Sequence, residues 1–193
     1  MLGVTETSVK TASDEALMLE VRDGQAAKLA VLFERHHRAL FHFFCRVTGN
    51  REQSEDLVQD VFFRLLKYRE TYQPRTSFCA WMYQVARNAH VDSLRKRRPE
   101  FQWPEDAPEP VSPEPLSDEK IRRSQEVELL HRALGALPAE KRELLVMTRF
   151  QNLKYEEIGE ILGCEVSAVK LRVYRAVRAL SQVFTELSAR RAT

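Results

Sequence analysis

The stretch that decides the fold reads Tyr155-Glu-Glu-Ile-Gly-Glu-Ile-Leu-Gly-Cys-Glu-Val-Ser-Ala-Val-Lys170. Ile158 and Leu162 are four residues apart, so they share one face of a helix. Gly163 permits a turn after that helix, and Gly159 leaves room where two helices cross closely. This spacing is typical of a helix-turn-helix whose second helix begins near Ser167.

The second helix has an apolar face and a basic face. The apolar residues recur at helical spacing: Val169, Val173, Ala176, Leu180, Phe184 and Leu187. The opposite face has no acid and carries Lys170, Arg172, Arg175 and Arg178. Such a face suits DNA phosphates and base edges in the major groove. A face that only meets water is the alternative, but four cations beside a glycine turn favour DNA binding.

Outward from this motif the sequence predicts further helices and no strand. In the C-terminal part, one helix carries Val127, Leu130 and Leu134, and the next begins near Pro138. In the N-terminal part, apolar spacing and breaks predict a helix capped by Ser13 that ends at Asp23-Gly24, and a helix over 25–47 broken at Thr48-Gly49-Asn50. A helix capped by Ser54 follows, then a loop around Tyr72-Gln73-Pro74 and a helix over 78–98. The expected fold class is therefore all-α.

An acidic, proline-rich stretch separates two modules. Six of the eight prolines fall between Pro99 and Pro115, and residues 99–119 hold seven acids and no Lys or Arg. Such a composition cannot form a packed helix. We therefore predict an N-terminal helical domain over 1–98, a flexible linker over 99–117 and a C-terminal helix-turn-helix domain over 118–193.

Composition excludes several function classes. The net charge is only +2, and the three cysteines are far apart with no metal-ligand spacing. His36 and His37 are adjacent, so on a helix they point about 100° apart and cannot both face one ion. With no nucleophile motif, phosphate loop, signal peptide or apolar run of membrane length, we expect no metal, no cofactor, no small-molecule substrate, no enzymatic activity and a cytoplasmic location.

Three motifs in order resemble those of the extracytoplasmic-function (ECF) class of bacterial RNA polymerase sigma factors. The segment Glu55-Asp-Leu-Val-Gln-Asp-Val-Phe62 is similar to the family's helix for core polymerase. The segment from Phe78 to Arg95 resembles its helix for the minus-ten promoter element, and the helix-turn-helix resembles its reader of the minus-thirty-five element. The resemblance runs from about Asp14 to Leu187, except for the linker.

This resemblance implies partners and site residues. The partners are core RNA polymerase, promoter DNA and an anti-sigma factor, without direct membrane insertion. Residues implied for the minus-thirty-five element are Ser167, Ala168, Lys170, Leu171, Arg172 and Arg175. Those implied for the minus-ten element are Tyr72, Asn88, Arg95, Lys96 and Arg97, and those for core polymerase are Asp56, Gln59 and Asp60.

The residues themselves leave some of these roles open. Acids at a helix start can serve the helix dipole alone, which accounts for Asp56 but less well for Gln59 and Asp60. Asn88 either lines a pocket for a flipped base or satisfies a buried backbone group. Tyr72 either stacks on a base or packs in the core, whereas Trp81 is expected to be a core residue.

Four positions depart from the family's usual pattern. The loop reads Tyr72-Gln-Pro-Arg-Thr76 where an Arg-Gly pair is common, and Ala168 replaces a common threonine. Gly159 replaces the usual alanine, which weakens that helix slightly. Lys154 stands where serine or threonine usually caps the helix, at a cost of about 1 kcal/mol.

Two other function classes fit a helical protein with one helix-turn-helix. A one-component transcription regulator would bind duplex DNA alone as a dimer and would ignore core polymerase. A helical adaptor that binds only proteins would show no steep salt-dependent DNA binding. Affinity for core polymerase therefore separates the sigma-factor interpretation from both.

Overall fold

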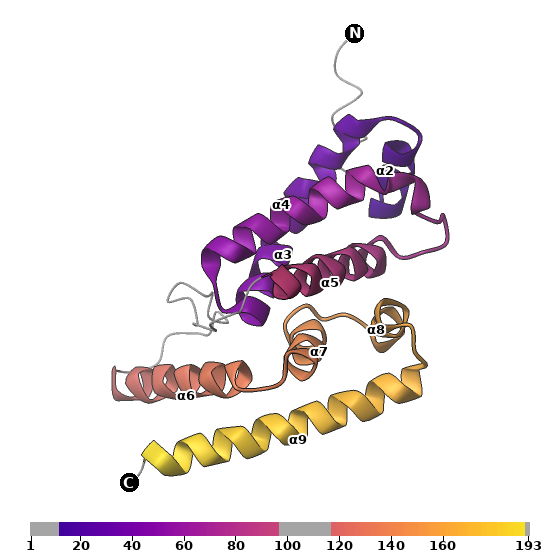
Figure 1. Ribbon diagram of the computed structural model, residues 1–193. Helices are drawn as coiled ribbons and strands as arrows, with labels where there is room; N and C mark the ends of the chain where they lie inside the picture. The colour runs from indigo at the N-terminus through magenta and orange to yellow at the C-terminus, as the bar shows by residue number, and fades with distance from the viewer. Residues whose placement is uncertain (1–11, 97–116, 192–193) are drawn as a thin grey trace.

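The computed structural model describes residues 12–96 and 117–191, and within these ranges the fold is all helical with no strand, as the sequence predicts (Figure 1). None of the described helices is long and apolar enough to cross a membrane. The predicted linker lies outside the described residues except for Ser117, which begins a helix. The elements are α2 (Asp14–Arg22), η1 (Ala26–Lys28), α3 (Leu29–Thr48), α4 (Arg51–Lys67), η2 (Arg69–Thr71), α5 (Phe78–Lys96), α6 (Ser117–Gly135), α7 (Ala139–Arg149), α8 (Tyr155–Leu162) and α9 (Val166–Arg191).

Local signals set most helix ends in the N-terminal half. The Ser13 side chain accepts a hydrogen bond from the Ala16 backbone N–H, which confirms it as the cap of α2. Gly49 ends α3 in the left-handed conformation at φ 67°. The predicted cap at Ser54 is wrong, because Asn50 Oδ1 accepts from Gln53 N at 2.8 Å and α4 begins at Arg51. Ser54 is buried inside α4, where its hydroxyl donates to the Asn50 carbonyl.

The core of the N-terminal half lies where α3, α4 and α5 meet. Phe43, Leu65 and Met82, one from each helix, are fully buried. The Phe43 ring meets the Tyr83 ring edge-on with centroids 5.3 Å apart. Trp81 is 8% exposed, which confirms it as a core residue. This packing fixes the outward faces of α4 and α5.

The C-terminal half is built around the crossing of α8 and α9. Ile158, Val169 and Val173 are buried between these helices and α7, and α6 runs alongside α9 (Figure 1). Gly163 ends α8 in the left-handed conformation at φ 59°. The helix-turn-helix predicted from the sequence is therefore present.

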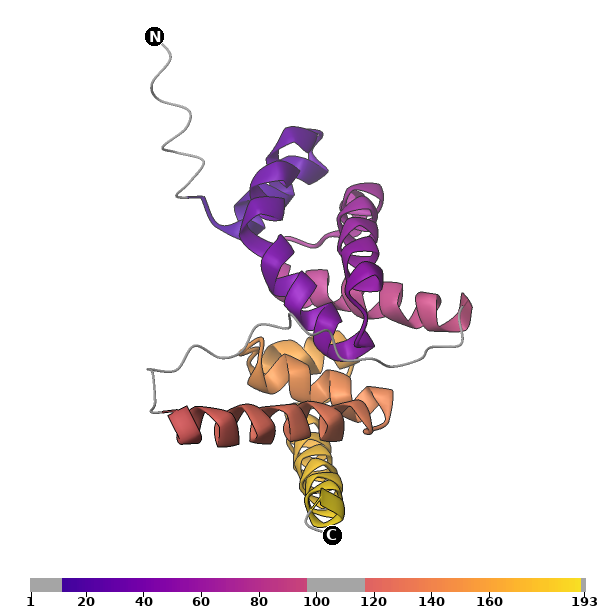
Figure 2. The same ribbon diagram turned by 90° about the vertical axis from the view of Figure 1, so that its left-hand side faces the viewer.

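The two halves contact one another directly. α7 and α8 lie between α5 and α9, and contacts join α3 to α7 and α5 to α8 (Figures 1 and 2). We call the polar contacts between the halves the docking interface. They include the ion pair of Arg87 Nε with Glu143 Oε2 at 3.1 Å and the hydrogen bond from Tyr83 Oη to Gln151 Oε1 at 2.8 Å. They also include the hydrogen bonds from Arg142 Nη1 to the Val47 carbonyl at 2.7 Å and from Ser77 Oγ to Glu157 Oε1 at 3.3 Å.

Gly159 is required by the close approach of the turn to α8. A Cβ at this position would lie 2.8 Å from the backbone carbonyl oxygen of Cys164, which is too short for a real contact. Gly159→Ala should therefore lower the free energy of unfolding by about 1 kcal/mol, because the clash outweighs the better helix propensity of alanine. Urea unfolding followed by circular dichroism measures this change.

A matched variant on the same helix is Glu160→Ala, whose side chain is exposed. It should change the free energy of unfolding by less than about 0.5 kcal/mol. A Gly159→Ala protein more stable than wild type would show that the turn relaxes freely around the added methyl group.

Candidate nucleic-acid interface

The helix-turn-helix presents α9 as an exposed, basic second helix. The turn is tied by the Cys164 backbone N–H, which donates to the Gly159 carbonyl at 3.0 Å. Ser167, Lys170, Leu171, Arg172 and Arg175 are exposed and Ala168 is half-buried, so all six predicted residues reach the surface of one helix. Val169, Val173 and Ala176 form the buried face, as the apolar spacing predicts.

An exposed tyrosine lies within this basic face. Tyr174 is 58% exposed, and the Arg178 guanidinium lies 5.9 Å from its ring centroid. Tyr174 is not among the residues predicted for DNA contact, although it stands four residues from both Lys170 and Arg178. Because residues four apart share a helix face, that spacing was the available signal. The face thus offers an aromatic ring among cations.

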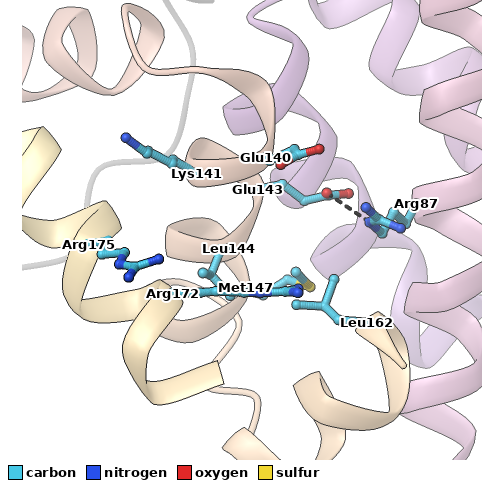
Figure 3. Close-up of a pocket in the computed structure, with 9 residues that line it drawn as sticks. All are labelled: Arg87, Glu140, Lys141, Glu143, Leu144, Met147, Leu162, Arg172 and Arg175. Carbon is cyan, nitrogen blue, oxygen red and sulfur yellow. Dashed lines mark hydrogen bonds and ion pairs between the residues drawn. The ribbon is translucent and has the colours of Figure 1, made fainter. Parts of the chain in front are cut away.

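Part of the basic face borders a cleft between α5, α7, α8 and α9. The cleft has a volume of about 370 Å³ and is lined by Arg87, Glu140, Lys141, Glu143, Leu144, Met147, Leu162, Arg172 and Arg175 (Figure 3). Figure 3 shows Arg172 and Arg175 on α9 and the two glutamates on α7. In this arrangement the arginines of the second helix share a cleft with two carboxylates.

A second exposed polar face lies on α4. Asp56 and Gln59 are exposed because Leu57, Val58 and Val61 of the same helix are buried. Asp60 is less available, because its Oδ2 pairs with Arg64 Nε at 3.0 Å. Asp56 and Gln59 are therefore open to a partner, whereas Asp60 is held in an ion pair.

The predicted residues of α5 divide into two groups. Asn88 and Arg95 are exposed, so the alternative in which Asn88 satisfies a buried group is not favoured. Asp92 of the same helix pairs through its Oδ2 with Arg64 Nη1 of α4 at 2.8 Å. The Lys96 side chain and Arg97 lie outside the part of the chain whose side chains are described.

Tyr72 is a core residue in this structure. Its side chain is fully buried, its ring centroid lies 5.1 Å from that of Trp81, and its hydroxyl donates to the Thr76 carbonyl at 2.7 Å. Burial raises the pKa of Tyr72 to about 12, with Glu15 and Asp14 adding to the effect. Of the two roles left open by the sequence, packing is favoured, because no face of the ring is available to a base.

Comparison with known proteins identifies the family. Residues 32–100 match the family model for Sigma-70 region 2, and residues 127–180 match that for Sigma-70 region 4. The chain is 33% identical over 173 residues to RNA polymerase sigma factor CarQ of Myxococcus xanthus, covering 88% of this chain and 97% of that protein. It is 30% identical over 185 residues to ECF RNA polymerase sigma factor SigE of Mycolicibacterium smegmatis, covering 92% and 71%. The chain is an ECF sigma factor.

Solved structures agree with this fold. CnrH in complex with the cytosolic domain of CnrY matches with a TM-score of 0.67 at 22% identity, covering 90% of this ECF sigma factor and 97% of CnrH. Sigma factor RpoE of Bartonella quintana, in complex with the anti-sigma factor NepR, matches with a TM-score of 0.63 at 22% identity, covering 81% and 96%. The predicted family and all-α fold are confirmed. As a sigma factor, the protein is a DNA-binding transcription initiation factor and not an enzyme.

Proposed function

We propose that this ECF sigma factor binds core RNA polymerase in the cytoplasm, reads the minus-thirty-five element with α9, and helps to open DNA at the minus-ten element with α5. The observation that carries the proposal is the exposed basic face of α9, set on the second helix of a helix-turn-helix. The α4 and α5 surfaces lie on the region 2 match and the α9 surface on the region 4 match.

On α9, cations would hold the duplex and shorter side chains would meet the bases. Lys170, Arg172 and Arg175 can bond phosphates or guanine edges, because all three are exposed on one helix. Ser167 stands at the start of the helix, where it can reach a phosphate. Leu171 and Ala168 can make apolar contacts to thymine methyl groups.

On α5, the minus-ten contact would fall to Asn88 and Arg95, followed by Lys96 and Arg97. The Asn88 amide can bond the edge of a base that has left the stack, which suits promoter melting. Tyr72 would act indirectly by holding its loop against the core through Trp81 and Thr76. The basic end of the helix would meet the backbone phosphates.

On α4, Asp56 and Gln59 would contact basic groups of core polymerase. Both are exposed and neither is needed for the buried face of the helix. Asp60 would have a smaller share, because it also pairs with Arg64. An exposed acidic face of this kind favours association with a positively charged partner.

Reading both elements at once would require the halves to separate. The names minus-ten and minus-thirty-five place the two elements about 25 base pairs apart, which is about 85 Å along a duplex at 3.4 Å per step. In the structure, Arg87 of α5 and Arg175 of α9 line one cleft, and Asn88 follows Arg87 directly. We therefore infer two domains, over 1–98 and 118–193, that part on promoter DNA. The twenty residues 97–116 can span up to about 70 Å when extended.

We also propose that an anti-sigma factor controls this protein. CnrH and RpoE, whose folds match this chain, are each found in a complex, and the partner of RpoE is the anti-sigma factor NepR. A partner that held the halves together would prevent the separation that promoter reading needs. Purification of the native protein from cells should recover a stoichiometric inhibitor, and recovery with polymerase alone would contradict this.

The experiment that tests the function is transcription in vitro with purified core polymerase. Adding this chain should start transcripts at a promoter that core enzyme alone ignores. The expected complex with core polymerase can be followed separately by fluorescence anisotropy. No binding to core enzyme and no change in initiation would reject the proposal.

Two variants should separate the two interfaces. Lys170→Ala should weaken binding to minus-thirty-five DNA by about 5- to 100-fold, because one cation leaves the DNA, and should leave affinity for core polymerase unchanged. Asp56→Ala should lower core affinity and leave DNA binding unchanged. DNA binding and core binding are measured separately by anisotropy titration.

Each variant has a matched control on its own helix. Arg190→Ala removes an exposed cation at the far end of α9, and Glu52→Ala removes an exposed acid one turn before Asp56. Neither control should affect binding by more than about threefold. A Lys170→Ala loss no larger than that of Arg190→Ala would remove α9 from the minus-thirty-five contact.

A further inference from the structure

Three metal-ligating side chains from distant parts of the sequence converge in the N-terminal half. Asp14 begins α2, His36 lies in the middle of α3, and Cys79 is the second residue of α5. One carboxylate oxygen, one imidazole nitrogen and the thiol sulfur all lie within 4.8 Å of one another, and all three residues are partly buried. His36 Nε2 and Asp14 Oδ2 are already 2.7 Å apart.

We propose that Asp14, His36 and Cys79 bind a zinc ion. Around tetrahedral zinc, bonds of about 2.0 Å to nitrogen or oxygen and about 2.3 Å to sulfur place the donor atoms about 3.3 to 3.6 Å apart. The three atoms of this cluster therefore reach zinc geometry through side-chain movements of about 1 Å. Three protein ligands leave the fourth position to water.

The surroundings already orient two of the three ligands. Arg35 Nη1 bonds the other oxygen of Asp14, Oδ1, at 2.6 Å and leaves Oδ2 facing His36. The His36 ring is held against the Phe78 ring with centroids 5.2 Å apart. Hydrogen bonds and packing from residues around the ligands fix the direction of the ligands and strengthen metal binding.

The charge around Cys79 favours a cation. Burial raises the pKa of the Cys79 thiol to about 11, and the carboxylates of Asp14, Glu157 and Glu15 act in the same direction. A zinc ion replaces the thiol proton and offsets the neighbouring carboxylates.

The mixture of donors selects the metal. Magnesium and calcium take oxygen ligands, whereas one sulfur, one nitrogen and one oxygen suit zinc. The ion would join α2, α3 and α5, which the chain brings together only on folding. Residue spacing does not reveal this site, because zinc motifs are recognised by closely spaced cysteines and histidines and these ligands stand far apart.

The site also lies close to the C-terminal half. Glu157 of α8 is near Cys79 and accepts a hydrogen bond from Ser77 Oγ at 3.3 Å. Ser77 immediately precedes α5. A zinc ion held by Cys79 would therefore lie beside a contact between the two halves.

The test is cobalt titration of the full chain, made without a histidine tag, stripped of metal and kept reduced. One equivalent of Co²⁺ should produce a thiolate-to-cobalt absorption band in the near ultraviolet and intense visible bands of a tetrahedral site. One equivalent of Zn²⁺ should then remove both. Cys79→Ala should abolish the ultraviolet band, and His36→Ala should weaken Co²⁺ binding by at least about tenfold.

Matched controls are Cys164→Ala and His37→Ala, which should bind Co²⁺ as wild type does. Circular dichroism checks that each variant is folded; if Cys79→Ala is not, Asp14→Asn serves through the visible bands, which should weaken. No stoichiometric bands in the wild type would overturn the proposal and leave an ion-pair network only. Bands that survive in folded Cys79→Ala, or that vanish in Cys164→Ala, would place the metal elsewhere and equally overturn it.

Discussion

Arg87→Leu should separate the two halves of this sigma factor. The substitution leaves the Glu143 carboxylate, which is 6% exposed, without its cation. Glu143 Oε1 is already buried with no hydrogen-bond partner among the described residues, and burial raises the pKa of this carboxyl even though Arg87 opposes the rise. An unpaired buried carboxylate costs about 3 kcal/mol, so the docked arrangement should lose about 100-fold in population relative to the separated one.

Small-angle X-ray scattering measures this separation as a larger radius of gyration. The double variant Arg87→Leu/Glu143→Leu should return towards the compact value, because no buried charge then remains. Arg149→Leu, which removes an exposed arginine of α7, is the matched control and should scatter as wild type does. Equal expansion of the single and double variants would mean that the ion pair does not govern docking.

Of the single substitutions proposed, Arg142→Met should lower the free energy of unfolding the most. The Arg142 guanidinium donates to the carbonyls of Leu134, Gly135 and Leu137 at 3.1, 2.6 and 3.0 Å, and to that of Val47 at 2.7 Å. The carbonyls at the last turn of a helix have no partner within the helix, so Arg142 satisfies groups at the ends of both α6 and α3. Methionine fills the space of the stem but donates nothing, and we expect a loss of about 4 kcal/mol.

Urea unfolding of wild type and Arg142→Met gives the difference directly. Arg142→Lys should recover only part of the loss, because an ammonium group cannot reach four carbonyls in a fixed planar fork. Arg132→Met, at an exposed position on α6, should change the free energy of unfolding by less than about 0.5 kcal/mol. A loss below about 1 kcal/mol for Arg142→Met would show that water satisfies these carbonyls.

The elements of the fold could be predicted because their signals are local. The apolar spacing of α9, the glycine after α8 and the serine before α2 each act within a few residues, and all three were correct. The error at Ser54 has the same origin. Asn50 and Ser54 both can cap a helix, and the choice depends on Ser54 being buried against Thr48, 3.1 Å from its hydroxyl.

The contacts that determine the candidate site join residues that are far apart in the sequence, so residue spacing does not predict them. Outward positions on α4 and α9 followed from the buried faces of the same helices. The ion pair of Asp92 with Arg64 joins two helices, so no spacing within α5 indicates it. Burial of Tyr72 depends on Trp81, and the ion pair of Arg87 with Glu143 depends on how the halves meet.

In the proposed function, the cleft beside α9 would make DNA binding and separation of the halves reciprocal. Arg172 and Arg175 of the C-terminal half border the same space as Arg87 of the N-terminal half, so a duplex phosphate bound by α9 and the docked α5 compete for one cleft. The free energy that the protein gains when phosphate occupies this cleft would also favour the parted arrangement, by the same factor in both directions. Tighter binding of DNA by α9 would then favour the separated arrangement, in which α5 is free to meet the minus-ten element. Added salt weakens the contacts to phosphate and would reverse the effect.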